Sequence, residues 1–148
     1  MTTKKTSQSE QETQEVAQKI KRILTNNPDK NVIALTGNLG AGKTKLTQFL
    51  AKEFNILKNI VSPTFLIMRK YELPHNKLNY FYHVDAYRLK NEKGLEKIGI
   101  KKIINNKKNI VIVEWADKVE KIIPDNALWI DLQHGKNKKE RIINIKNE

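Results

Sequence analysis

The chain has 148 residues, enough for one domain with a substantial core but too few for two. It contains no cysteine, which excludes disulfide bonds and thiolate metal sites. Its apolar runs are far shorter than the roughly 20 residues that span a bilayer, and the N-terminus continues into polar residues instead of an apolar secretory segment. We therefore expect a cytoplasmic protein that does not associate with membranes.

The net charge of +12 favours an acidic partner, for which nucleic acid is an obvious candidate. Only four of the 28 basic residues are arginine, however, and arginine is the better bidentate partner for phosphates and base edges. The composition thus favours a solvated lysine surface over specific recognition of nucleic acid. Any contact with nucleic acid is expected to be indirect or nonspecific.

The first predicted helix follows a short N-terminal segment, residues 1–8, that we expect to be flexible, so that one domain spans residues 9–148. Ser9 followed by Glu12 forms a capping box, in which each side chain satisfies a backbone N–H of the other residue. An apolar stripe with helical spacing then follows: Val16, Ile20, Ile23 and Leu24. The sequence Asn26-Asn27-Pro28-Asp29 ends this helix.

The most informative segment is an octet, residues 37–44, with the sequence Gly-Asn-Leu-Gly-Ala-Gly-Lys-Thr. It matches the phosphate-binding P-loop pattern at every defined position, between a predicted buried strand at 31–36 and a predicted helix that reaches about residue 54. Small residues in such a loop let backbone N–H groups point at an anion, and the following helix adds the positive end of its dipole. We expect the phosphates to lie against the backbone of Asn38, Leu39, Gly40, Ala41 and Gly42.

Two side chains at the end of the octet carry the remaining phosphate chemistry. Lys43 is expected to reach the β- and γ-phosphates of a nucleoside triphosphate, and the Thr44 hydroxyl to bind Mg²⁺. Guanine-specific P-loop hydrolases carry an Asn-Lys-x-Asp tetrapeptide, which does not occur in this sequence. The sequence therefore favours ATP as the nucleotide.

The rest of the chain alternates predicted strands and helices. In order, these are an extended stretch at 60–71, a turn at 73–77, a strand at 78–85, a helix at 91–104 broken near Gly99, a buried strand at 109–114, a short helix to 123, and strands at 127–132 and 141–145. We predict an α/β protein with a three-layer P-loop NTPase fold and a mixed parallel and antiparallel central sheet.

Two carboxylates end apolar strands, where a P-loop protein needs an acidic side chain to hold Mg²⁺ or its water shell. Glu114 follows the apolar run 110–113, and Asp85 follows an aromatic-rich strand in which alternation places His83 on the same face. We expect at least one of the two carboxylates to bind the metal or activate water. His83 itself is more typical of a structural histidine than of a catalytic base.

Three further residues have alternative roles. Thr64, in a loop stiffened by Pro63, either senses the γ-phosphate and Mg²⁺, as switch loops do, or satisfies the backbone of a turn. Arg88 either pairs with a phosphate or a carboxylate, or lies at the surface. Trp115 either stacks on a base or fills the core, and the core is the favoured interpretation.

Taken together, these segments resemble the TsaE family, which comprises small bacterial P-loop ATPases needed for the threonylcarbamoyladenosine modification of tRNA. The matching pieces, in order, are 37–44, Ser62-Pro63-Thr64-Phe65, Tyr71, His83-Val84-Asp85-Ala86-Tyr87-Arg88 and Val113-Glu114-Trp115. The resemblance spans about residues 9 to 145. A very large superfamily shares the P-loop, whereas the other elements at these separations are much more specific.

The resemblance implies catalytic and metal-binding roles for five residues. Lys43 and Thr44 would bind phosphate and Mg²⁺, and Glu114 would be the carboxylate on the metal side. Asp85 would be a second catalytic carboxylate at the metal, and Thr64 would lie in a switch-like loop beside the reacting groups.

It also implies an adenine end of the site. Ser9 and Thr13 resemble the family's N-terminal elements near the adenine, and Arg141 resembles a C-terminal arginine of the nucleotide-binding pattern, without an assigned role. Two departures from the pattern are Asn38, where an aspartate is common, and Ala116, where a proline is frequent. Neither departure removes a phosphate or metal ligand.

The function implied is that of an ATPase with weak activity alone, which works on a partner heterodimer that transfers the threonylcarbamoyl group. ATP binding or hydrolysis would then reset the partner between catalytic cycles. Two alternatives remain open from the residues. One is a stand-alone small-molecule or nucleotide kinase, which would need a mobile arginine-bearing lid. The other is a binding module in which ATP acts only as a structural switch.

Overall fold

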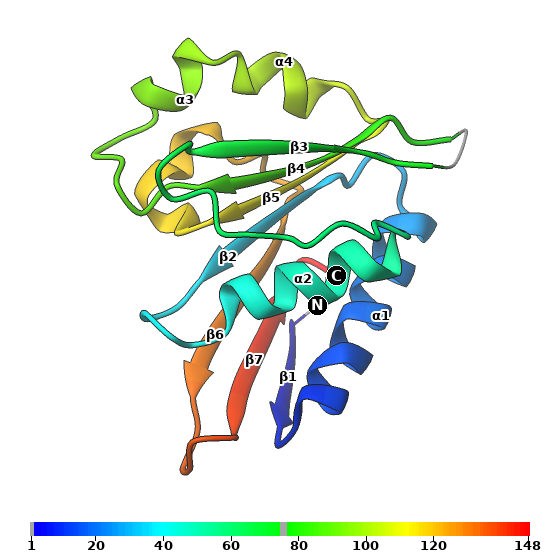
Figure 1. The fold of residues 1–148 in the computed structure, drawn as a ribbon, viewed down its shortest axis with the longest axis vertical. Coiled ribbons are helices and arrows are strands. Elements are labelled where there is room, and N and C mark those ends of the chain that lie inside the picture. The colour runs from blue at the N-terminus through cyan, green and yellow to red at the C-terminus, as the bar shows by residue number, and fades with distance from the viewer. Residues whose placement is uncertain (1, 75–76) are drawn as a thin grey trace.

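A seven-stranded mixed sheet forms the centre of the computed structural model, which describes residues 2–74 and 77–148 (Figure 1). The strands lie in the order β1-β7-β6-β2-β5-β4-β3. Their bounds are β1 Thr2–Ser7, β2 Val32–Thr36, β3 Met68–Glu72, β4 Tyr80–Asp85, β5 Asn109–Glu114, β6 Leu128–His134 and β7 Arg141–Lys146. The four central strands β6, β2, β5 and β4 are parallel, whereas β1, β7 and β3 pair antiparallel with their neighbours. The predicted α/β class and mixed sheet are confirmed.

Helices cover both faces of this sheet. On one face lie α1, Glu10–Asn26, and α2, Lys43–Glu53; on the other lie α3, Lys93–Lys97, α4, Ile100–Asn105, and the 3-10 helix η1, Ala116–Ile122 (Figure 1). No helix within the described ranges is long and apolar enough to cross a membrane.

The two hydrophobic cores explain why β2 is apolar at four consecutive positions, 32–35. In β2, Ile33 and Leu35 join the core under α1 and α2, while Val32 and Ala34 join the core under α3, α4 and η1. Side chains of a strand alternate between faces, so a strand that is covered on both faces favours apolar residues at consecutive positions. This burial holds the carboxyl ends of β2, β4 and β5 at one edge of the sheet.

One half of the predicted capping box is confirmed at the start of α1, whereas Glu12 accepts from Gln8 instead of Ser9. The backbone N–H of Glu12 donates to Ser9 Oγ at 3.2 Å, and the N–H of Gln8 donates to Glu12 Oε2 at 2.8 Å. The helix ends at Asn26, as expected from the Asn-Asn-Pro sequence. These contacts fix Ser9 at the start of the helix.

The expectation that residues 1–8 are flexible is wrong for Thr2–Ser7. These residues form β1, which pairs antiparallel with β7 at the edge of the sheet. Ser7 is buried, and its hydroxyl lies 2.7 Å from Thr13 Oγ1. The segment has no apolar pattern that would predict a strand. Backbone bonds to a strand more than 130 residues away in the sequence hold it in place. The single domain at residues 9–148 stays a prediction.

The extended stretch expected at 60–71 is a strand only over Met68–Glu72. Before it the chain turns, because the backbone N–H groups of Leu66 and Ile67 both donate to the carbonyl of Pro63, at 2.9 and 2.6 Å. Ile67 has a φ of 66°, an unfavourable conformation for a β-branched residue. The turn predicted at 73–77 includes residues 75–76, which lie outside the described part of the chain.

Candidate nucleotide-binding site

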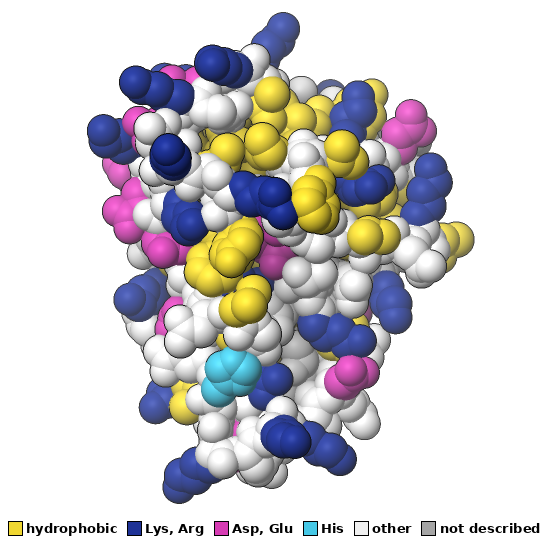
Figure 2. Space-filling view, turned by 60° about the vertical axis from the view of Figure 1, so that its left-hand side comes forward, with side chains coloured by type: hydrophobic (Ala, Val, Ile, Leu, Met, Phe, Trp, Pro, Cys, Tyr) yellow, Lys and Arg dark blue, Asp and Glu magenta, His cyan; other side chains and the backbone are white. Residues whose placement is uncertain are grey.

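The predicted catalytic side chains lie around one cleft of about 300 Å³ at the carboxyl ends of the parallel strands. Asp85 and Glu114 end β4 and β5 and are partners in the ladder that joins these strands. Thr44 donates a hydrogen bond to Glu114 and Thr64 donates one to Asp85, and all four residues line the cleft. Figure 2 shows this side of the molecule, with an acidic side chain recessed between groups of hydrophobic ones. The sheet therefore brings together residues that are far apart in the sequence.

The P-loop joins β2 to α2 and contains three glycines with positive φ. Gly37, Gly40 and Gly42 have φ values of 133°, 76° and 106°. Gly42 is the N-cap of α2, and a glycine there offers no side-chain acceptor to the first turn. The first N–H groups of α2 are thus available to an anion at the positive end of the helix dipole.

We expect Gly37→Ala to destabilise the protein strongly. A Cβ at Gly37 would lie 2.2 Å from the carbonyl oxygen of Leu132 in β6, in addition to the strain of a φ of 133°. Strain of this kind costs about 1–3 kcal/mol, and the melting temperature of a domain this size falls by roughly 2–4 °C per kcal/mol. Thermal unfolding followed by circular dichroism measures the effect.

Gly99→Ala is the matched control for this prediction. Gly99 has a φ of 81°, but a Cβ there would meet nothing within 4 Å. It therefore isolates the conformational strain from the clash with the backbone of β6. An equal loss of melting temperature in the two variants would show that the close approach of Gly37 to Leu132 contributes nothing.

Lys43 is held inside the loop. Its Nζ donates to the carbonyls of Gly37 and Asn38 at 2.6 and 3.0 Å and lies 4.1 Å from the centre of the Trp115 ring. Burial lowers the pKa of Lys43 below its ordinary value, although nearby carboxylates, with Glu114 first, oppose this shift. The ammonium group is poorly solvated, and the carbonyl oxygens that accept from it are neutral. A negatively charged phosphate oxygen would therefore bind the ammonium group more strongly than these carbonyls do.

Glu114, at the end of β5, links α2 to the buried strand β4. Its side chain is buried; Thr44 Oγ1 donates to Oε1 at 2.9 Å, and His83 Nε2 lies 2.5 Å from Oε2. No group of three or more acidic, histidine or cysteine side chains that could hold a metal occurs among the described residues. A hydroxyl and one or two carboxylates, completed by phosphate and water oxygens, are the donor set that Mg²⁺ prefers. The residues present therefore fit Mg²⁺.

Asp85 is tied to the loop that contains Thr64. Its Oδ2 accepts from Thr64 Oγ1 at 2.8 Å and from Ser62 Oγ at 3.1 Å, while Oδ1 accepts from the backbone N–H of Tyr87 at 2.9 Å. The carboxylate is buried at the base of the cleft. A group that binds Asp85 would compete directly with Thr64, so the loop can respond to the contents of the cleft.

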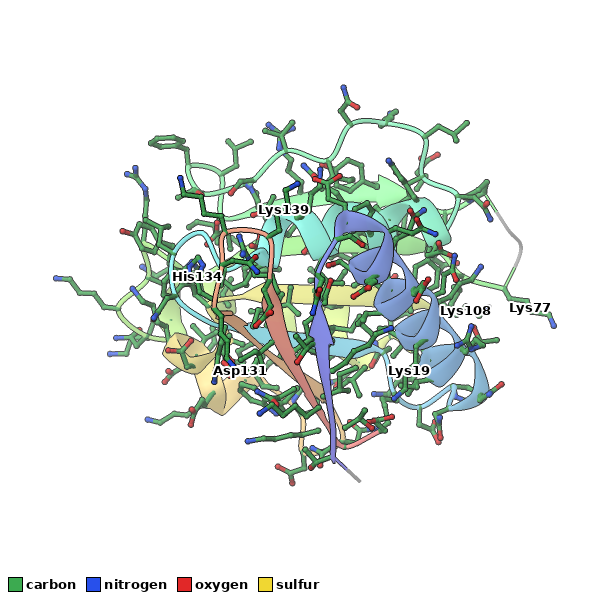
Figure 3. The ribbon with its side chains drawn as sticks, turned by 90° about the horizontal axis from the view of Figure 1, so that it is seen from below. Lys19, Lys77, Lys108, Asp131, His134 and Lys139 are labelled. Atoms are coloured by element: carbon green, nitrogen blue, oxygen red, sulfur yellow. The ribbon has the colours of Figure 1, made fainter. Side chains whose placement is uncertain are left out.

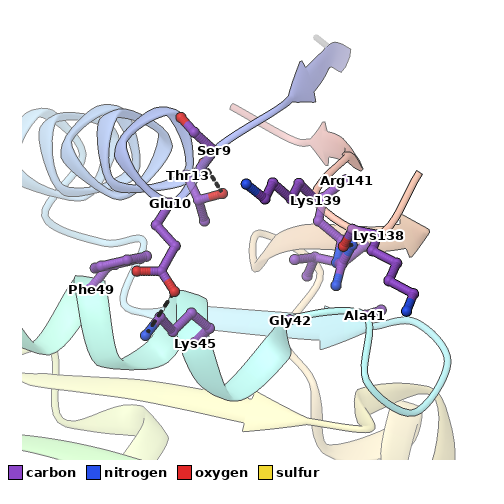
Figure 4. Close-up of a pocket in the computed structure, with 11 residues that line it drawn as sticks. Ser9, Glu10, Thr13, Ala41, Gly42, Lys45, Phe49, Lys138, Lys139 and Arg141 are labelled. Atoms are coloured by element: carbon purple, nitrogen blue, oxygen red, sulfur yellow. Dashed lines mark hydrogen bonds and ion pairs between the residues drawn. The ribbon is translucent and has the colours of Figure 1, made fainter. Parts of the chain in front are cut away.

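A second pocket, of about 480 Å³, adjoins the first on the other side of Gly42 and Lys45 (Figure 4). It is lined by Ser9 and Thr13, which the resemblance places near the adenine, and by Arg141, which the resemblance left without an assigned role. An ion pair of 3.2 Å between Lys45 and Glu10 links α2 to α1 beside this pocket. The two pockets therefore adjoin along the P-loop, between the start of α1 and the carboxyl ends of β4 and β5.

Sequence reasoning did not identify several residues of the second pocket. Phe49 and Leu132 give the second pocket apolar walls, and Lys138 and Lys139 of the β6–β7 loop line its rim. These residues belong to three separate elements, and a periodic pattern places them in the core or at the surface without indicating a ligand. Only their position in the fold identifies them.

The structure shows where the residues with alternative predicted roles lie. Arg88 lies over the ring of Phe65, with 4.1 Å between Cζ and the ring centre. Trp115, for which a core position was favoured, is half-buried and lines the cleft. His83 is fully buried, which agrees with a structural histidine, but its partner is the carboxylate of Glu114.

Three of the lysines that Figure 3 labels lie on different loops. Viewed from below, Lys139 lies near His134 at the carboxyl end of β6, whereas Lys77 and Lys108 lie at the far side of the molecule (Figure 3). They belong to separate loops, before β4, β5 and β7. This distribution suits a solvated lysine surface better than a single nucleic-acid groove.

Comparison with known proteins found a family model, relatives and a solved structure that are similar to the chain. Residues 7–143 match the family model described as threonylcarbamoyl adenosine biosynthesis protein TsaE. Curated tRNA threonylcarbamoyladenosine biosynthesis proteins TsaE are similar to the chain. The one from Rickettsia bellii is 31% identical over 95% of this chain and 92% of its own, and the one from Bacillus subtilis is 32% identical over 71% and 63%. The crystal structure of Bacillus subtilis YdiB superposes with a TM-score of 0.73 at 26% identity, covering 98% of this chain and 84% of that one.

Proposed function

The chain belongs to the TsaE family of threonylcarbamoyl adenosine biosynthesis proteins, and on that premise we propose that it is a Mg²⁺-dependent ATPase. Its role is in the biosynthesis of threonylcarbamoyladenosine in tRNA. We propose further that it acts on a partner heterodimer that transfers the threonylcarbamoyl group. The observation that carries the ATPase proposal is the convergence of Lys43, Thr44, Thr64, Asp85 and Glu114 on one cleft.

Each of these side chains has a chemical task that its position supports. The P-loop N–H groups and Lys43 bind the phosphate oxygens and balance the charge that develops on them during transfer. Thr44 and Glu114 would hold Mg²⁺, which would supply charge neutralisation to the phosphates. Asp85 or Glu114 orients the attacking water, and Thr64 links the occupied cleft to its loop.

The surroundings of the cleft support an action on a partner. Leu39, Phe65 and Leu66 are 73%, 82% and 61% exposed, and they lie on the P-loop and on the loop that contains Thr64. Large apolar side chains gathered at one exposed place are typical of a protein interface. Among the described residues, no helix or strand covers the cleft as a kinase lid would, so a partner is the better candidate to close it.

The decisive experiment is phosphate release from ATP with and without the transferase heterodimer, at varied Mg²⁺. Slow turnover by the isolated protein, strict dependence on Mg²⁺ and stimulation by the heterodimer are expected. A folded protein that neither binds ATP nor hydrolyses it would overturn the proposal. Transfer of labelled γ-phosphate to a small-molecule acceptor would instead identify a kinase.

We expect Phe65→Ala to weaken the response to the partner. An exposed aromatic anchor at an interface contributes about 1–2 kcal/mol, so the heterodimer concentration for half-maximal stimulation should rise roughly 5- to 30-fold. Basal turnover should stay the same, because the exposed Phe65 side chain contacts Arg88 and does not line the cleft. Leu57→Ala, at a residue 98% exposed but outside the cleft, is the matched control. Equal behaviour of both variants would exclude Phe65 from the interface.

A further inference from the structure

A fully buried histidine contacts the metal-side carboxylate of the cleft. His83 has no exposed surface and belongs to β4, while Glu114 ends the neighbouring strand β5. His83 Nε2 lies 2.5 Å from Glu114 Oε2, and both side chains are buried. The histidine therefore meets the carboxylate from the core, and the cleft lies on the other side of Glu114.

The direction of this hydrogen bond follows from the chemistry of the two groups. An ionised carboxylate only accepts hydrogen bonds, so the hydrogen must be on His83 Nε2. His83 Nδ1 has no hydrogen-bond partner among the described residues, and a proton there would bury an unused donor. The geometry thus favours the tautomer of His83 that is protonated on Nε2 and donates a hydrogen bond to Glu114.

Because of this bond, the two carboxylate oxygens of Glu114 have different partners. Oε2 is held by His83 from the core, and Oε1 is left facing the hydroxyl of Thr44. Without His83 the carboxylate would be free to turn about its last side-chain bond, and Oε2 would be buried without a donor. The strand ladder keeps the two side chains in place, because β4 and β5 are paired in parallel along their whole length.

We propose that His83 is a positioning residue, which orients the Glu114 carboxylate for Mg²⁺ from the core side. This inference rests on the Mg²⁺–ATP function proposed above. It assigns His83 no contact with nucleotide or metal. Partners of this kind, one contact removed from the metal, typically change metal affinity by about 10- to 100-fold when they are removed.

The test compares three variants by calorimetric binding of a non-hydrolysable ATP analogue across a range of Mg²⁺ concentrations. For His83→Leu, we expect the Mg²⁺ concentration at half-maximal enhancement of binding to rise by roughly 10- to 100-fold, with unchanged binding in the absence of Mg²⁺. His83→Gln should restore most of the effect, because its amide N–H can donate in place of Nε2. Phe81→Leu, a buried residue on the same face of β4, is the control for a general loss of packing.

A second measurement on the unaltered protein needs no variant. Nitrogen-15 NMR of the histidine side chains reports which ring nitrogen carries the proton. A proton on Nε2 of His83 supports the proposal, and a bare Nε2 with the proton on Nδ1 would overturn it. His83→Leu with the same Mg²⁺ dependence as Phe81→Leu would also overturn it. If the parent protein shows no Mg²⁺-dependent binding at all, the proposed function fails instead.

Discussion

Glu114→Gln is expected to lower Mg²⁺-dependent phosphate release by about 10²- to 10⁴-fold, the range seen when a positioned acid–base group is lost. The amide has the shape of the carboxylate but no charge for the metal, and it cannot accept from Thr44 and His83 at once. ATP binding without Mg²⁺ should change little, because the P-loop backbone and Lys43 are intact. Steady-state phosphate release at saturating ATP measures the loss.

Glu120→Gln is the matched control, because it removes the same charge from an exposed position in η1. Its turnover should equal that of the parent protein. Comparable turnover in the two variants would exclude Glu114 from the reaction. A second test of Glu114→Gln is whether the variant supports the tRNA modification in cells. If Glu114→Gln lacks turnover but still supports the tRNA modification, ATP acts as a structural switch and hydrolysis is not required.

Lys43→Ala is expected to weaken binding of ATP by roughly 10- to 100-fold, which corresponds to about 1.5–3 kcal/mol for hydrogen bonds to a charged group. The same change should leave the fold intact. Lys43 Nζ bonds only to carbonyls of its own loop among the described residues, and its ammonium group is poorly solvated in the structure. Isothermal titration calorimetry and thermal unfolding measure the two quantities.

Lys52→Ala tests whether the effect comes from the position or merely from a lost positive charge. Lys52 is an exposed residue of the same helix, α2, at the end away from the P-loop. Its affinity for ATP should match that of the parent protein. Unchanged binding by folded Lys43→Ala would contradict the assignment of the octet to phosphate.

The candidate site was largely predictable because its main parts are short and local. The octet 37–44 requires glycines where the backbone takes positive φ, and three of them occupy such positions in the structure. Glu114 and Asp85 were recognisable because each follows an apolar strand, and strands that run parallel end at the same edge. Both signals lie within a few consecutive residues. The ligands themselves, ATP and Mg²⁺, stay predictions.

Contacts between distant segments were not predictable in the same way. Thr2–Ser7 has no apolar pattern and is ordered by its pairing with β7. The bond between His83 and Glu114, and the position of Lys43 against Trp115, join segments 31 and 72 residues apart. Alternation indicated only that His83 and Asp85 share a face of one strand. The partner of a side chain depends on which strand lies beside it.

The sequence by itself thus determined the class of the fold, the location of the P-loop and the two carboxylates, because these depend on local backbone conformation and on the alternation of burial. The tertiary structure alone decided which side chains meet. It placed Ser9 and Thr13 of α1 beside Arg141 of β7, and it placed His83 against Glu114. Strand order and register are set by packing over the whole chain, and no short window of residues contains that information.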